Sequence, residues 1–574
     1  MKVLGRAPVG RLLGLLLVCL TVSVGAVAVF GASASAGASA SAAAIRPVAD
    51  CGSLANADLS HVDAIVFSAQ VTPQQGHSYC EVTGIITPQT HFDVLLPTTT
   101  WTGDYLQQGC GGFCGLAAGS QSVSLLDPSR TSLSQGTWAP LLNGQLVVGA
   151  DDQGHRAKTN SDALWAKNDP QLRVVYGYTS EHSMLLVAKA LMGAFYRRGP
   201  AYSYFAGVSD GGHEALDLAQ RYPQDFNGIL VGAPANNLAA LFGVDETWQA
   251  RANMDAGGHQ ILTAEKLPAL HAAVVRACGD RDGVIRDPRA CTFDPRTLQC
   301  APGTDTVTCL TPAQVEVVRR EYRGPTDQAG DSLYDGGEPY GSELSWNGWL
   351  AMPAGDAAAP VDTASAQLAI NYLKYAAYWF NPPNSYTLQD FRFTLAAARA
   401  LNPLGRIYDA TDPDLRAFRR HGGKLILYQG WADQAIPPQT SLDYYAAVIR
   451  HVGGFAASQS FSRLYMIPGL YHCACGNYGA GSPETHPQFM AELVAWVERG
   501  QAPQAVSFPV TGQSPSPNLH TITVEPLNPL VGVPHNNGLN SNYRYIDKGR
   551  IYRPQHLVWC IQRGPRLVCT GRRP

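Results

Sequence analysis

The fold is indicated most clearly by residues 204–223, YFAGVSDGGHEALDLAQRYP. The apolar residues 204–206 are typical of a buried strand, and a Gly-rich turn leads directly into a helical stretch that ends at Arg221. Ser209 lies at this turn within the pattern Gly-x-Ser-x-Gly. A tight strand-to-helix turn forces a serine to project its hydroxyl group, and flanking glycines permit the crowded backbone. Ser209 is therefore a candidate nucleophile; the alternative is an ordinary Gly-rich turn at the edge of a sheet.

The chain on both sides of this turn alternates between short apolar runs and amphipathic stretches. The runs that predict buried strands are residues 94–96, 146–149, 174–176, 204–206, 229–231, 425–428 and 464–467. Helical spacing extends over residues 181–198 and 488–499. Such alternation predicts the α/β class, with a mostly parallel sheet and helices on both of its faces.

The alternation is interrupted between residues 243 and 405, where four cysteines, many prolines and Gly-Asp-rich loops occur. We interpret this segment as an inserted lid domain that divides the catalytic domain into two parts. Trp346, Trp349 and Trp379 either line an aromatic pocket of the lid or fill its core, which is the commoner role. The predicted boundaries are a signal peptide over 1–44, a catalytic domain over 45–242 and 406–515, the lid over 243–405 and a C-terminal extension over 516–574.

The composition excludes several classes of protein. The chain has 574 residues, of which 45% are hydrophobic and 15% charged, so it is too apolar for a disordered chain and too long for one compact module. Its formal net charge of −3 provides no basic field that would hold the phosphates of a nucleic acid. We therefore expect a large globular protein without a nucleic acid partner.

The N-terminus is typical of a secretory signal peptide. A basic start precedes an uncharged apolar run over residues 12–30, and Ala-Ser repeats follow it. Cleavage is expected near Ala34 or Ala44; the alternative is an uncleaved membrane anchor, because the run is about long enough to span a bilayer. Cleavage removes three basic residues and no acidic ones, which takes the net charge from −3 to −6. We predict a secreted, extracellular protein that has no membrane contact after cleavage.

The cysteines also indicate an oxidising compartment. Thirteen are present, and Cys19 leaves with the signal peptide, so twelve remain, which fits up to six disulfides. A structural zinc site would need paired Cys-x-x-Cys knuckles, and the sequence has none. Pairs between near neighbours are expected for Cys278 with Cys291, Cys300 with Cys309, and Cys560 with Cys569.

Two further side chains complete a candidate catalytic triad. Asp433 directly follows the apolar run over residues 425–430, and His472 lies in the loop after the next predicted strand. Parallel strands deliver such residues to one edge of the sheet, and the order serine, acid, histidine is that of α/β-hydrolases. A serine hydroxyl is a poor nucleophile without a base, which His472 would supply. Asp443 is the alternative acid.

Several segments together resemble the tannase and feruloyl esterase family. They are YLQQGCGGFCG at 105–115, SDGGHEAL at 209–216, AQRYP at 219–223, GAPA at 232–235, YQGWAD at 428–433 and PGLYHC at 468–473. The resemblance runs from about Cys51 to beyond Arg499. It implies an α/β-hydrolase core with an inserted lid, and a secreted esterase whose substrates are small esters of galloyl, feruloyl or related hydroxybenzoyl or terephthaloyl acids, including polyphenol and plant-wall esters. Asp151 and His155, in another segment that resembles the family, are interpreted as structural hydrogen-bonding groups near the site.

The resemblance also implies a role for each site residue. Ser209 is the nucleophile, His472 the general base and acid, and Asp433 the group that orients His472. The backbone N–H groups of Asp210 and of a residue around Gly111 form the oxyanion hole, and no cofactor takes part in the chemistry. Two alternatives stay open: a general carboxylesterase or peptidase on the same fold, and a binding relative without activity.

The chain departs from the family at a disulfide. Family members carry a cysteine just before the serine and another just after the histidine, and these two form a disulfide between the catalytic loops. Here position 208 is Val, so Cys473 needs another partner or stays free. Cys110, Cys475 and a free thiol are the three possibilities. Cys110 would otherwise pair with Cys114 or Cys51.

A second departure concerns a calcium loop that family members often carry in the inserted domain. The matching stretch here, CGDRDGVI at residues 278–285, is shorter than the family loop. Asp280, Asp282 and the Val284 carbonyl could still bind calcium, which prefers hard oxygen ligands. The alternative is a metal-free turn closed by a disulfide between Cys278 and Cys291.

Overall fold

The computed structural model describes residues 43–115, 138–355, 361–472, 484–485, 489–511, 520–531, 557–563 and 566–571. Residues Ala44–Pro574 form one compact unit, and the description below concerns this unit alone. The predicted signal peptide lies almost entirely outside the described residues, and so do Cys473 and Cys475. Among the described helices, none combines the length and the apolar composition needed to cross a bilayer.

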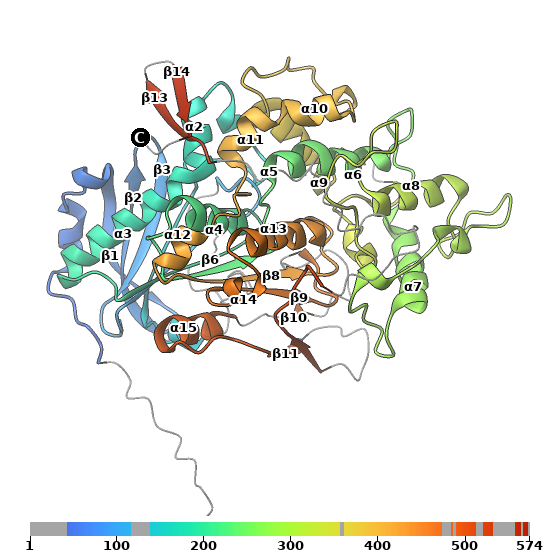
Figure 1. The fold of residues 1–574 in the computed structure, drawn as a ribbon. Helices are drawn as coiled ribbons and strands as arrows, with labels where there is room; N and C mark the ends of the chain where they lie inside the picture. Colours follow the sequence, from blue (N-terminus) through green and yellow to red (C-terminus); the bar gives the residue numbers. More distant parts are fainter. Residues whose placement is uncertain are drawn as a thin grey trace, which may run out of the picture. The chain divides into compact units, whose positions relative to one another are not determined.

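A large mixed sheet forms the centre of the structure (Figure 1). Its strands within the described residues are β1 (Ala64–Gln74), β2 (His77–Ile86), β3 (Thr90–Pro97), β4 (Asp104–Gln108), β5 (Leu146–Asp151), β6 (Tyr202–Val208), β7 (Gly228–Gly232), β8 (Lys424–Gly430) and β9 (Ser462–Ile467). They are ordered β1-β2-β3-β5-β4-β6-β7-β8-β9. Neighbours from β5 to β9 are parallel, whereas β1, β2, β3 and β5 pair antiparallel. The sheet is the mostly parallel one that an α/β-hydrolase core requires.

Alternate side chains of the parallel strands enter two separate cores. Phe205 and Val231 lie in one core, and their neighbours Tyr204 and Leu230 lie in the other. Successive residues of a strand point to opposite faces, so a continuous apolar run is what a sheet covered on both faces needs. The helices α3 (Ser180–Tyr196), α4 (Asp210–Arg221) and α13 (Pro438–His451) cover the first core, and α1 (Ala139–Leu142) and α15 (Phe489–Arg499) cover the second.

Residues 174–176, predicted as a strand, are helical. They lie at the end of α2 (Pro170–Val174) and in a π-helical turn (Val175–Thr179) that continues into α3. The side chain of Asp169 accepts hydrogen bonds from two backbone N–H groups of the first turn of α2, and Pro170 occupies the first helical position. A short buried apolar run is compatible with either a strand or a helix, and here the N-terminal cap decides for the helix.

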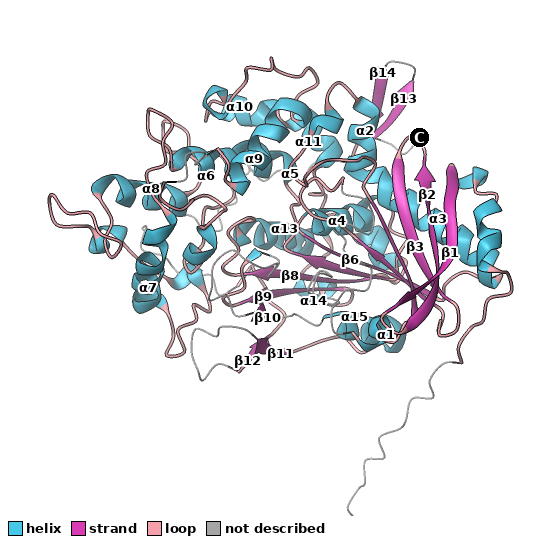
Figure 2. Ribbon diagram, turned by 180° about the vertical axis from the view of Figure 1, so that it is seen from behind, coloured by secondary structure: helices cyan, strands magenta, loops and turns pink. Residues whose placement is uncertain are grey.

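The strands β1 and β2 were not predicted. They form the antiparallel end of the sheet next to β3 (Figure 2). β1 is an edge strand, and Ile65, Phe67 and Val71 on it are exposed. Because only part of each strand is buried, polar residues interrupt the apolar run on which the prediction depended.

The chain between β7 and β8 forms an insertion of short helices and loops (Figure 1). Its helices are α5 (Leu238–Ala240), α6 (Glu246–Ala252), α7 (Leu267–Cys278), α8 (Pro312–Arg323), α9 (Ala364–Asn371), α10 (Leu395–Ala400), α11 (Asn402–Tyr408) and α12 (Arg416–Arg420). α14 (Phe455–Ser458) precedes β9. Two small sheets follow in sequence, one of β10 (Glu484–Thr485), β11 (Val506–Thr511) and β12 (Thr521–Val524), the other of β13 (Trp559–Arg563) and β14 (Arg566–Thr570).

The described part of the chain contains five disulfides. Three are the expected local pairs, Cys278 with Cys291, Cys300 with Cys309, and Cys560 with Cys569. The other two join Cys51 to Cys80 and Cys110 to Cys114. Cys110 therefore pairs within its own loop, which was one of the alternatives, and not with Cys473.

Candidate active site

Ser209 lies at a sharp turn between β6 and α4. Its backbone has φ 67° and ψ −119°, which is unfavourable for a residue with a side chain. Backbone hydrogen bonds hold this conformation: the Ser209 N–H donates to the Gly232 carbonyl at 3.0 Å, and the Ser209 carbonyl accepts from three further N–H groups. A Cβ at position 207 would collide with the Gly211 carbonyl, so the turn requires glycine there. The surrounding backbone thus holds Ser209 in its strained conformation, and this conformation presents the Ser209 hydroxyl at the strand end.

The three side chains predicted as a triad lie together. His472 Nδ1 is 2.9 Å from Asp433 Oδ2 and 3.0 Å from its Oδ1, and His472 Nε2 is 2.9 Å from Ser209 Oγ. An ionised carboxylate can only accept hydrogen bonds, so we assign the proton of the neutral imidazole to Nδ1. Nε2 then accepts the hydrogen bond that the Ser209 hydroxyl donates. In this tautomer the ring is ready to take up the serine proton.

Asp433 is fully buried and enclosed by donors. Its Oδ1 accepts two backbone N–H groups of the following turn, both at 2.9 Å, and its Oδ2 accepts from Gln429 Nε2 at 2.7 Å. These bonds stabilise the carboxylate and fix the direction in which it faces His472. Asp443, the alternative acid, lies on α13, and the contact with His472 is made by Asp433.

The two N–H groups predicted for an oxyanion hole come from α4 and from the loop after β4. Asp210 begins α4, where a backbone N–H has no partner within the helix. The Gly211 N–H donates to the Cys110 carbonyl at 2.7 Å and so holds residues 109–115, which we call the oxyanion loop, against the first turn of α4. Within the described residues no acceptor is found for the N–H of Asp210 or of Gly111. In that part of the chain nothing competes with a ligand for either N–H.

The three tryptophans of the insertion differ in their surroundings. Trp346 is fully buried and its Nε1 donates to Glu338 at 2.9 Å, so it belongs to the core. Trp349 is buried next to the triad, and its ring centroid lies 6.2 Å from that of His472. Trp379 is 42% exposed. Of the three, Trp349 is the one placed beside the reacting groups.

Asp151 and His155 make structural hydrogen bonds, as interpreted from the sequence. Asp151 Oδ1 accepts from the Gln153 N–H at 2.6 Å and from the Ser180 hydroxyl at 3.1 Å, and burial raises the pKa of Asp151 to about 6. The ring of His155 is stacked on that of Trp165, with 4.1 Å between the ring centroids, and burial lowers the pKa of His155 to about 3. The buried His155 side chain therefore carries no charge at neutral pH.

A metal at the oxyanion loop does not fit the residues present. Cys110, Cys114, Asp210 and Glu214 offer ligand atoms that lie within 4.8 Å of one another. Cysteine binds a metal through its thiolate, and here both sulfur atoms are joined in a disulfide. The cluster therefore has no thiolate ligand while the disulfide is intact.

Calcium does not fit the loop over residues 278–285 either. Arg286 donates to Asp280 Oδ2 at 2.6 Å and to Asp282 Oδ1 at 3.0 Å, and it also bonds the second oxygen of Asp282. The Val284 carbonyl accepts the N–H of Asp280 at 3.0 Å. Calcium needs six to eight oxygen ligands. The two predicted carboxylate ligands instead bond the Arg286 guanidinium, whose hydrogen bonds hold the pKa of Asp282 below its usual value.

We expect the stability of the protein to be independent of calcium. Neither excess calcium nor chelation with EDTA should shift Tm, because the Arg286 guanidinium already bonds both carboxylates. Arg286→Gln should cost no more than about 1 kcal/mol, since the ion pairs are partly exposed. Thermal unfolding with and without calcium measures both effects. A Tm that rises with calcium and falls with EDTA in the unaltered protein would contradict this expectation.

Sequence reasoning missed the side chains that hold the triad in place. The backbone N–H of His472 donates to Gln434 Oε1 at 3.1 Å, and Gln249 in α6 donates to the Gln434 carbonyl at 3.4 Å. Gln249 Oε1 in turn accepts from Trp349 Nε1 at 2.9 Å. Glutamine carries no motif, and the one available signal was that Gln429 and Gln434 flank the predicted acid. The insertion is thus connected to the histidine loop through amide side chains.

The sheet order, the strained serine turn and the serine–histidine–aspartate contacts define an α/β-hydrolase. The family described as tannase and feruloyl esterase matches residues 71–526, which is most of the chain. The chain belongs to this family, and it is an esterase on that basis.

The relatives agree with this assignment. The chain is 33% identical over 473 residues to an uncharacterized esterase of Xanthomonas campestris pv. campestris, covering 75% of this chain and 77% of that protein. It is 30% identical over 488 residues to the mono(2-hydroxyethyl) terephthalate hydrolase of Piscinibacter sakaiensis, covering 75% of this chain and 78% of that protein. The crystal structure of feruloyl esterase B from Aspergillus oryzae shares the fold, with a TM-score of 0.68, 22% identity, and coverage of 83% of this chain and 96% of that one.

Proposed function

We propose that the chain is a secreted serine esterase that hydrolyses small esters of aromatic acids through an acyl-enzyme. The observation that carries the proposal is the 2.9 Å contact between His472 Nε2 and Ser209 Oγ, with Asp433 on the other ring nitrogen. The family and a relative whose name specifies a terephthalate ester support the aromatic acyl group. The five disulfides of the described residues and the N-terminal segment support secretion.

The proposed reaction has two steps. Ser209 Oγ forms a bond to the ester carbonyl carbon while His472 Nε2 takes the serine proton, and the oxyanion accepts hydrogen bonds from the N–H groups of Asp210 and Gly111. The carbon–oxygen bond of the ester then breaks, and the alcohol leaves with the proton from His472. Water repeats the sequence on the acyl-enzyme, with His472 again as the base, and releases the acid.

A panel of acyl donors tests the proposal. We expect turnover of methyl esters of gallic, ferulic and protocatechuic acid or of a terephthalate monoester, and no cleavage of the corresponding anilides. A fluorophosphonate probe should label Ser209, as located by peptide mass spectrometry. Anilide cleavage without aryl ester cleavage would favour a peptidase. Acetate and butyrate esters hydrolysed at the same rate as the aryl esters would favour a general carboxylesterase. An unlabelled Ser209 would indicate a binding relative without activity.

A further inference from the structure

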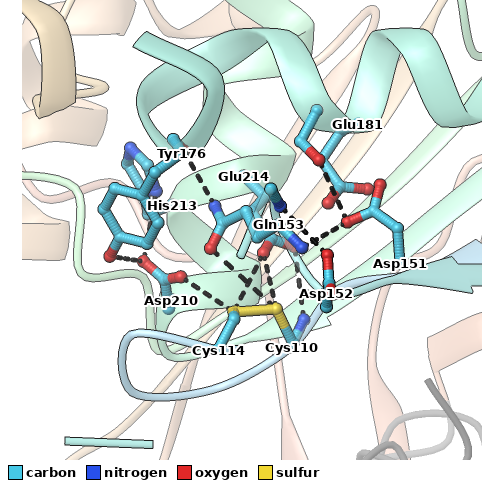
Figure 3. The surroundings of a disulfide bond; sticks show 12 residues. Cys110, Cys114, Asp151, Asp152, Gln153, Tyr176, Glu181, Asp210, His213 and Glu214 are labelled. Atoms are coloured by element: carbon cyan, nitrogen blue, oxygen red, sulfur yellow. Dashed lines mark hydrogen bonds and ion pairs between the residues drawn. A yellow bond between two sulfur atoms is a disulfide. The ribbon is translucent and has the colours of Figure 1, made fainter. Parts of the chain in front are cut away.

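Glu214 lies on α4 directly behind the oxyanion loop (Figure 3). Its side chain is 2% exposed and touches Cys110 at two points. Glu214 Oε2 accepts the backbone N–H of Cys110 at 3.3 Å, and Glu214 Oε1 lies 3.1 Å from the Cys110 sulfur. A Cβ at Gly109 would collide with Glu214 Oε2, so the backbone of the loop approaches the carboxyl group as closely as glycine permits. This acid therefore packs against the loop and takes no part in the triad.

A proton on Glu214 accounts for its contact with sulfur. A sulfur atom in a disulfide has no hydrogen to donate, and an ionised carboxylate can only accept. Burial, together with the charges of Glu181 and Asp210, raises the pKa of Glu214 well above its usual value. The neutral acid can then donate its O–H to the Cys110 sulfur while its other oxygen accepts the Cys110 N–H. The Glu214 side chain thus bonds both the backbone and the sulfur atom of Cys110.

The position of Cys110 determines where the next N–H points. A peptide unit is planar and trans, so the Cys110 carbonyl and the Gly111 N–H point in opposite directions within one plane. The carbonyl end of this unit is bonded to the Gly211 N–H at 2.7 Å, and the preceding peptide unit is bonded to Glu214. Apart from Gly111 and its two chain neighbours, no heavy atom of the described structure lies within 4 Å of the place that a Cβ of Gly111 would take. The two anchors on α4 therefore orient the Gly111 N–H together with the turn in which the Gly111 carbonyl accepts the Cys114 N–H at 3.1 Å.

The disulfide between Cys110 and Cys114 completes this arrangement. Cys114 Sγ lies 3.6 Å from Glu214 Oε1 and 3.3 Å from Asp210 Oδ2, so both sulfur atoms face α4 (Figure 3). The two cysteines are separated by 4 positions, and closing so short a loop restrains the unfolded chain less than a long loop would. We expect its effect to be local, on the shape of the oxyanion loop.

We propose that Glu214 is a positioning residue for the oxyanion hole: it bonds the backbone N–H and the disulfide sulfur of Cys110 and so orients the Gly111 N–H. The inference rests on the proposed function, because the direction of this N–H matters only where an oxyanion forms. Glutamine has the same shape as protonated glutamate, with an N–H in place of the O–H. It should preserve both contacts, whereas alanine removes both.

Kinetics of Glu214→Ala and Glu214→Gln test the proposal. With a methyl ester that the unaltered protein hydrolyses, Glu214→Ala should lower kcat about 10²-fold, the range for loss of one oxyanion donor, while KM changes little. Glu214→Gln should keep kcat close to that of the unaltered protein. Unchanged kcat in Glu214→Ala, or an equal loss in both variants, would overturn the role of Glu214.

Two further measurements separate this role from stability and from the choice of substrate. The rate of Ser209 labelling by a fluorophosphonate, whose phosphonyl oxygen enters the same oxyanion hole, should fall in Glu214→Ala even if no aryl ester proves to be a substrate. Failure of the ester panel alone contradicts only the proposed function.

If Glu214→Ala does not fold, Cys110→Ala/Cys114→Ala removes the sulfur contact and should lower kcat about tenfold. Cys300→Ala/Cys309→Ala, which opens a loop of the insertion, is the matched control and should leave kcat unchanged. A kcat that does not fall in the first pair, or that falls equally in both pairs, would rule the proposal out.

Discussion

Ser209→Ala is expected to lower kcat by roughly 10⁶-fold while the protein stays folded. The substitution removes the atom that would bond to the acyl carbon and leaves the Cβ, so the strained turn at φ 67° keeps its backbone hydrogen bonds. Residual turnover should come from substrate binding and the oxyanion hole acting on water. Hydrolysis of a methyl aryl ester under substrate saturation measures the effect, and the loss of fluorophosphonate labelling gives a second readout.

A buried serine outside the site provides the control. The Ser345 hydroxyl donates to the Ser342 carbonyl at 2.6 Å in the insertion, and Ser345→Ala should leave kcat unchanged. Circular dichroism and Tm should be alike for both variants and the unaltered protein. Substantial activity in folded Ser209→Ala would contradict the assignment of the nucleophile and would direct the search to another hydroxyl group.

The triad could be predicted because each member follows a strand end that the sequence marks clearly. Ser209 follows β6, Asp433 follows β8 and His472 follows β9, and all three strands are buried on both faces and read as continuous apolar runs. Parallel strands bring such positions to one edge without any knowledge of the loops between them. The order of the chain was therefore enough to place these residues together, whatever the insertion does.

Contacts that depend on tertiary packing could not be predicted in the same way. The sequence left three alternatives for the partner of Cys110, because spacing does not determine disulfide connectivity. Glu214 lies in a helix whose pattern gives no reason for an acid to be buried, and only the structure places it against Cys110. The insertion carries Trp349 to the triad through Gln249, a contact between segments about 100 residues apart.

Asp433→Asn is expected to lower kcat about 10⁴-fold with little change in KM. The amide has nearly the same shape, and its oxygen can still accept the two backbone N–H groups that bond Asp433 Oδ1. Its NH₂ group then faces His472 Nδ1, which must act as acceptor, so the proton moves to Nε2. A protonated Nε2 cannot take the proton of Ser209, and no carboxylate remains to stabilise the imidazolium. Saturation kinetics on one aryl ester give kcat and KM separately.

Asp443→Asn distinguishes a specific role from a general effect of charge. Asp443 was the alternative acid; it lies ten positions further along the chain on α13, where it accepts from Gln439 Nε2 at 2.7 Å. Its asparagine variant should keep kcat, because His472 is bonded to Asp433 and not to Asp443. Loss of activity in Asp443→Asn together with full activity in Asp433→Asn would reverse the assignment. Equal losses in both would indicate that the negative charge acts at a distance, since a tautomer can be fixed only by the group that bonds Nδ1.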